Sequence, residues 1–109
     1  MAKGRDWNAD VAQGSEVAGS LRQGIVTANA STATPVVADS TDIIWVILQN
    51  LGTALVYFGS SSVVNSGASR GPRMTPNGES PVMKLEDLSK LYVISASGSQ
   101  DIAYLAGVK

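Results

Sequence analysis

The sequence contains no histidine and no cysteine. Without histidine it lacks the commonest general base, the commonest transition-metal ligand and the usual switch for pH near neutrality. Without cysteine it has neither disulfides nor thiolate metal sites. Serines are plentiful, but neither Lys84 nor Lys90 belongs to a motif that activates a serine. We therefore interpret the chain as non-enzymatic and expect no catalytic residue, no cofactor and no metal site.

Charge is also scarce. Charged residues make up 16% of the 109 residues, and the net charge is −1. Soluble domains typically carry about 25% charged residues, so this composition indicates a surface that packs against other protein. Eight Lys and Arg against nine Asp and Glu provide no basic excess for nucleic acid or for an anionic membrane surface. We expect neither as a partner.

Long apolar segments are missing too. The longest uninterrupted apolar run covers residues 43–48, far short of the roughly 20 residues that a membrane helix needs. Residues 1–6 lack the apolar core of a signal peptide. The length favours one soluble domain, and a domain of this size gains stability from association because its core is small.

Residues 1–23 differ from the rest and are predicted to form an extended N-terminal arm. Charged residues are mixed there with Ala, Gly and Ser, and Gly14 and Gly19 interrupt a weak helical spacing. The arm is either a loose chain end or a segment that becomes ordered on a neighbouring subunit. In the second case Trp7 is the expected anchor in a partner's pocket, and Arg5 is a candidate contact beside it.

Residues 24–109 read as a β-domain with seven or eight short strands, which predicts an all-β fold: a small antiparallel β-sandwich or jelly-roll-like domain. Strands are expected at 24–28, 35–37, 43–49, 54–58, 81–85, 91–96 and 101–106. The expected strands also carry most of the aromatic side chains. These are interpreted as core or interface residues: Trp45, Tyr57, Phe58, Tyr92 and Tyr104.

Two turn sequences predict β-hairpins. Asn50 and Gly52 lie in the polar segment 49–53 between two apolar strands, and both residue types tolerate the positive φ of a tight reversal. Residues 97–100 are predicted to join the last two strands in the same way. The apolar run 43–48 indicates a strand covered on both faces, on its outer side by the arm, by a loop or by another subunit.

Residues 59–80 form a long loop rich in Gly, Pro and Ser, and loops of this length are usually functional or cover something. Arg70 and Arg73 in this loop are candidate contacts to an acidic patch of a partner, because arginine binds carboxylates bidentately. The alternative is that both are simply solvated. The carboxylates of Glu86 and Asp87 are interpreted as part of a solvated turn.

The turn and strand residues of 43–106 resemble small β-sandwich structural proteins of tailed bacteriophages. The resemblance rests on four motifs: Gln-Asn-Leu-Gly-Thr at 49–53, Val-Tyr-Phe-Gly at 56–59, Pro-Asn-Gly-Glu-Ser at 76–80 and Leu-Tyr-Val-Ile-Ser-Ala-Ser-Gly at 91–98. It covers a little over half of the chain and does not include the arm. These motifs carry no known site, so no functional residue is transferred.

The resemblance implies a virion component without enzymatic activity, made in the host cytoplasm. The favoured expectation is a capsid decoration (cement) protein on the capsid surface, which bridges and stabilises subunits of the major capsid protein. Such proteins often form homo-oligomers, with a trimer favoured. The alternative is a head–tail connector, tail or fibre-base component. A more distant alternative is a carbohydrate-binding β-sandwich.

Overall fold

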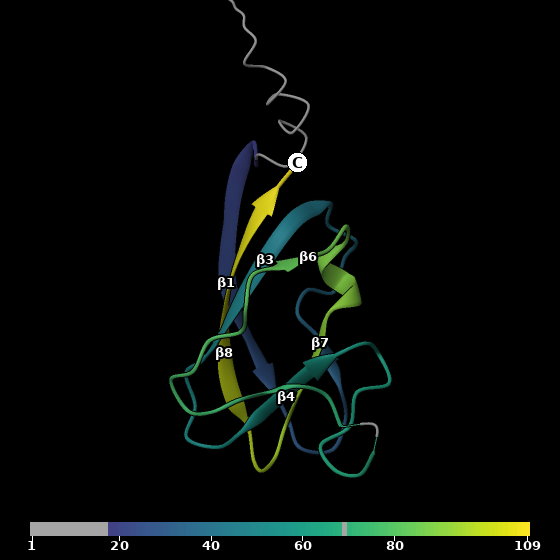
Figure 1. Cartoon of the computed structure of the whole chain (residues 1–109), viewed down its shortest axis with the longest axis vertical. Helices are drawn as coiled ribbons and strands as arrows, with labels where there is room; N and C mark the ends of the chain where they lie inside the picture. Colours follow the sequence, from purple (N-terminus) through teal and green to yellow (C-terminus); the bar gives the residue numbers. More distant parts are fainter. Residues whose placement is uncertain (1–17, 69) are drawn as a thin grey trace, which may run out of the picture.

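The computed structural model describes residues 18–68 and 70–109, which form two packed antiparallel sheets of four strands each (Figure 1). Sheet A has the strand order β1-β8-β3-β6, and sheet B has the order β2-β7-β4-β5. The element bounds are β1 Ser20–Ala28, β2 Thr34–Pro35, β3 Ile43–Asn50, β4 Val56–Gly59, β5 Arg73–Met74, β6 Met83–Lys84, the 3₁₀ helix η2 Leu88–Lys90, β7 Tyr92–Ser95 and β8 Gln100–Val108. The predicted all-β, antiparallel sandwich is confirmed.

The three long strands all lie in sheet A. β1 begins at Ser20, four residues before the predicted start at Gly24, so residues 20–23 belong to the sheet. It pairs with β8 along its whole length, from Ser20 opposite Val108 to Ala28 opposite Gln100. Figure 1 shows these two strands side by side at the end where the C-terminus lies. By contrast, β2, β5 and β6 have only two residues each.

Both predicted hairpins are wrong. β3 lies between β8 and β6 in sheet A, whereas β4 lies between β7 and β5 in sheet B. β7 and β8 are likewise in different sheets. Both edges of β3 and both edges of β8 are already paired with other strands, so neither has an edge free for the strand next to it in the sequence. Residues 51–55 and 96–99 are therefore crossings between the sheets.

The buried side chain of Asn50 holds the first crossing. Its Nδ2 donates to the carbonyl oxygens of Ala54 (2.8 Å) and Met74 (3.1 Å), and its Oδ1 accepts from the backbone nitrogen of Gly52 (2.9 Å). Asn50 is fully buried, and a buried amide needs partners of this kind. Its side chain thus supplies the hydrogen bonds that a hairpin ladder would otherwise give to this segment.

Gln100 joins the two crossings to each other. Its Oε1 accepts from the backbone nitrogen of Thr53 (2.8 Å), and its Nε2 donates to the carbonyl oxygen of Ser97 (2.9 Å). Gly52 lies so close that a Cβ at this position would collide with the Gln100 side chain. A glycine is therefore required at 52 for close approach, although its φ is not in the left-handed region.

The main core lies between the two sheets. β3 contributes Val46 and Leu48, which are both fully buried, while Trp45 and Ile47 on its other face are only partly buried. Residues on the same face as Val46 and Leu48 join a single apolar cluster, whose largest fully buried members are Ile43, Leu48, Met74, Leu88 and Ile102. Of the five strand aromatics, Tyr57, Phe58 and Tyr104 are buried and Trp45 and Tyr92 partly so.

A second, smaller cluster covers the outer face of sheet B. Val63, from the long loop 59–80, packs with Tyr57 of β4 and Ile94 of β7, and all three are buried. Asn65 fixes the same loop by donating to the carbonyl oxygens of Ala30 (2.9 Å) and Ser95 (2.8 Å). The long loop therefore serves as a cover for sheet B.

The role of Asn50 predicts a specific loss of stability. Asn50→Ala removes three hydrogen bonds and leaves backbone groups buried without partners, so we expect the free energy of unfolding to fall by about 1–3 kcal/mol. Thr53→Ala is the matched control, because this exposed side chain lies in the same crossing; its change should stay within about 0.5 kcal/mol. Urea unfolding of both variants measures the difference, and equal stability would contradict the assignment.

Candidate interaction surface

Sheet A differs from sheet B in having no cover on its outer face within 18–68 and 70–109. Strand register places outward-facing side chains in rows across β1, β8 and β3. One row contains Gln23, Leu105 and Ile47, and the next contains Ile25, Ala103 and Gln49. We call this surface the outer face of sheet A and define it by its apolar members: Leu21, Ile25, Trp45, Ile47, Ala103 and Leu105.

Trp45 lies at one end of the outer face of sheet A. It lies opposite Gly107, which in turn lies opposite Leu21. A Cβ at Gly107 would collide with the indole of Trp45 and with Ala18, so the absence of a side chain at 107 lets the indole lie over β8. The indole is only partly buried there, and Leu21 beside it is 64% exposed.

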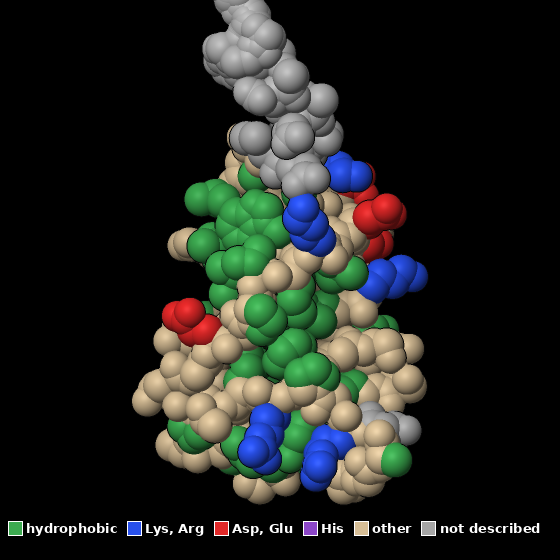
Figure 2. Space-filling model, viewed as in Figure 1, with side chains coloured by type: hydrophobic (Ala, Val, Ile, Leu, Met, Phe, Trp, Pro, Cys, Tyr) green, Lys and Arg blue, Asp and Glu red, His purple; other side chains and the backbone are tan. Residues whose placement is uncertain are grey.

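The middle of the face forms an open groove of about 490 Å³. Its apolar lining comes from Ile25, Ile47, Ala103 and Leu105, and Ile25 is 60% exposed. The residues with polar side chains at the groove are Gln23, Gln49, Glu79 and Tyr104, and Glu79 is the charged one among them. Figure 2 shows hydrophobic side chains gathered on the side of the molecule where Figure 1 labels β1, β3 and β6. Grooves of this composition, apolar with a few polar groups, are typical of binding surfaces.

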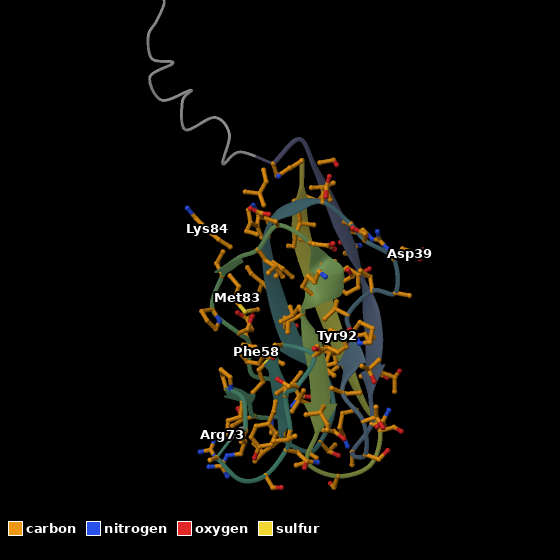
Figure 3. All side chains as sticks on the ribbon, turned by 90° about the vertical axis from the view of Figure 1, so that its right-hand side faces the viewer. Asp39, Phe58, Arg73, Met83, Lys84 and Tyr92 are labelled. Carbon is orange, nitrogen blue, oxygen red and sulfur yellow. The ribbon has the colours of Figure 1, made fainter. Side chains whose placement is uncertain are left out.

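The two described candidate contacts, Arg70 and Arg73, lie in the long loop and at the edge of sheet B, not on this face. Arg73 belongs to β5, the edge strand of sheet B, and Arg70 precedes it in the same loop; both are exposed. Figure 3 shows Arg73 toward the lower end of the molecule and Lys84 of β6 toward the upper end. Trp7 and Arg5 lie outside the described residues. The proposed contact roles of all four remain predictions.

Asp87, which the sequence analysis assigned with Glu86 to a solvated turn, is the centre of a cluster of hydrogen bonds. Its carboxylate accepts hydrogen bonds from Ser40 Oγ (2.7 Å), Thr41 N (3.0 Å), Ser89 N (3.0 Å) and Ser89 Oγ (2.8 Å). Asp87 is the N-cap of η2. The hydrogen bond from Ser40, followed by those from Thr41 and Ser89, holds the pKa of the Asp87 carboxyl well below its ordinary value of 3.8. This carboxylate therefore ties the turn before β3 to the turn before β7.

Within the described parts of the chain, no three acidic side chains gather as metal ligands would. No helix in these parts has the length and apolar character to cross a membrane. The buried strand aromatics Tyr57, Phe58 and Tyr104 do not form an exposed platform for stacking on a sugar ring. The outer face of sheet A is thus the main candidate surface in these residues.

Comparison with known protein families, curated proteins and solved structures finds no match for this chain. The resemblance to phage structural proteins therefore stays a prediction. Most residues of the outer face lie in strands that the sequence predicted, and the run 43–48, which includes Trp45 and Ile47, indicates a strand covered on both faces. Leu21 and Gln23 were missed, because both were assigned to the arm and not to a strand beside β8.

The geometry of Asp87 predicts a pH-dependent contribution to stability. Because the folded state lowers the pKa of this carboxyl, the contribution is present above 3.8 and is lost as pH falls below that value, when the unfolded chain takes up the proton first. We expect Asp87→Asn to lower the melting temperature at pH 7 and the difference from the parent chain to shrink in acid. Asp39→Asn is the control, because Asp39 is exposed on the turn before β3 to which Asp87 binds. A pH-independent difference would contradict the prediction.

Proposed function

We propose that this chain is a non-enzymatic structural protein that binds a larger protein assembly through the outer face of sheet A. The observation that carries the proposal is the contrast between the sheets: the chain's own loop covers sheet B, while the groove with Ile25 and Ile47 is left open to solvent. The lack of histidine and cysteine and the low charge support a structural role. The phage resemblance supports a capsid decoration protein that bridges subunits of the major capsid protein.

Burial of this face supplies the binding energy in such a role. Full burial of one exposed Leu or Ile side chain is worth about 1.5–3 kcal/mol, and Leu21 and Ile25 are each about 60% exposed. A partner with an apolar, weakly charged segment fits the groove, because an unpaired charge buried there would be costly. When many copies bind one shell, their modest interfaces together stabilise the shell mechanically. The long loop with Arg70 and Arg73 is a second expected contact.

Copy number on particles tests the location. Quantitative mass spectrometry of phage particles, purified from cells that produce this chain, compares the amount of the chain with that of the major capsid protein. Hundreds of copies per particle support a decoration protein. A few copies indicate instead the connector or tail alternative, and the absence of the chain from particles overturns a virion role. Glycan binding without particle association would favour the carbohydrate-binding alternative.

The face itself is tested by occupancy on shells that lack the chain. Ile47→Glu places a charge in the groove, so we expect its affinity for shells to fall more than about tenfold, which corresponds to about 1.4 kcal/mol. Thr53→Glu is the control, because it adds the same charge at an exposed position in the crossing, outside the groove. Melting curves must first show that both variants are folded. Equal occupancy of both variants would rule out this face.

The arm has a separate test that leaves the strands intact. Because β1 begins at Ser20, deletion of residues 1–17 removes Trp7 and Arg5 without shortening the sheet. If Trp7 anchors the arm in a partner, the truncated chain and Trp7→Ala should both lose shell occupancy while their melting temperatures stay close to that of the full chain. Undiminished occupancy of both variants would exclude a role for the arm.

A further inference from the structure

The outer edge of β1 is a long strand edge without a partner strand in the described part of the chain. β1 is the terminal strand of sheet A, and its nine residues pair only with β8. About half of the backbone N–H and C=O groups of an antiparallel strand point away from its neighbour, so β1 directs a row of them outward. β1 contains neither proline nor lysine, the residues that natural proteins use to protect an exposed edge.

The other three sheet edges are poor sites for pairing. β6 and β5 have two residues each, and they follow shortly after Pro81 and Pro72. β2 also has two residues, and Pro35 is one of them. Proline lacks the N–H that a ladder needs. Among the described edge strands, only β1 is long enough to form a ladder of hydrogen bonds with a strand of a second copy. An edge contact between two copies therefore pairs β1 with β1.

We propose that β1 pairs antiparallel with β1 of a second copy around a two-fold axis. A contact between identical edges closes on itself and ends at a dimer. Residues that lie opposite each other in a sheet have their side chains on the same face. When all nine residues of β1 pair with all nine of the second copy, Gly24, the middle residue, lies opposite Gly24 of that copy. On the outer face this register sets Gln23 opposite Ile25 and Leu21 opposite Thr27.

Charge is compatible with this pairing. The outward residues of β1 are Leu21, Gln23, Ile25 and Thr27, and none is charged. The only charged residue of the strand is Arg22, which lies on the opposite face and donates from Nη1 to Thr41 Oγ1 (3.2 Å). The two Arg22 residues lie four positions apart along the paired strands, or about 14 Å, beyond the Debye length of about 8 Å. Like charges therefore do not oppose the two-fold contact.

The dimer joins two four-stranded sheets into one continuous sheet. Both outer faces then lie on the same side, with the two grooves flanking the axis. Exposed Leu21 and Ile25 gain neighbours from the second copy. This inference concerns the chain alone and does not depend on a shell or on any role in one, so its test can fail independently of the proposed function.

Sedimentation of the purified full chain tests the association. We expect a monomer–dimer equilibrium and an increase of more than about tenfold in the dissociation constant for Ile25→Lys, because this variant brings two like charges close to the axis. Val82→Lys, which changes an equally exposed residue near β6, should dimerise like the parent chain. A monomer at all concentrations, a trimer, or equal dissociation constants for the two variants would overturn the proposal.

Distances between spin labels test the register. The chain has no cysteine, so Leu21→Cys and Thr27→Cys each give a single labelling site. With Gly24 on the axis, each label lies six residues from its copy, and both distances should be equal, at about 21 Å between backbones. If the register is shifted by one pair, the distance between labels at one of the two positions increases and the distance at the other position decreases. Unequal distances, or no distance in this range, would exclude the proposed pairing.

Discussion

The crossings between the two sheets are the constraint on which the rest of the structure depends. Asn50 and Gln100, both buried, bind the backbone of the crossing segments through four hydrogen bonds, and Asn50 makes a fifth to the carbonyl oxygen of Met74 in β5. Each amide satisfies polar groups that would otherwise be buried without partners. Because the chain changes sheets at both places, β3 and β8 become neighbours although they are distant in sequence.

This arrangement separates long strands from short ones. β1, β3 and β8 lie in sheet A together with the two-residue β6, and the other short strands and the long loop lie around sheet B. Val63 of the loop then closes the outer face of sheet B over Tyr57 and Ile94. No described loop does the same for sheet A, which leaves an apolar groove and a long strand edge next to each other. The proposed contacts with other proteins and with a second copy both arise from this asymmetry.

Much of the fold could be predicted from the sequence, but only part of the candidate interaction surface could. Apolar runs such as 43–48 correctly locate β3, and the turn residues correctly locate its end. The same turn residues do not indicate whether the next strand pairs with β3 or crosses to the other sheet, since Asn and Gly serve both geometries. Leu21 and Gln23 were missed because a strand with few large apolar residues is stabilised by its partner β8 rather than by its own composition.

By itself, the sequence determined the all-β class, most of the strand positions and the lack of histidine and cysteine chemistry, because these depend on local propensity and on residue type. Only the tertiary structure decided which strands are neighbours, which faces are covered and which edge is left without a partner strand in the described residues. Those properties depend on contacts between residues far apart in the chain, such as Gln100 with Thr53 and Trp45 with Gly107. No local pattern encodes such a contact, since each partner alone is compatible with several sheet arrangements.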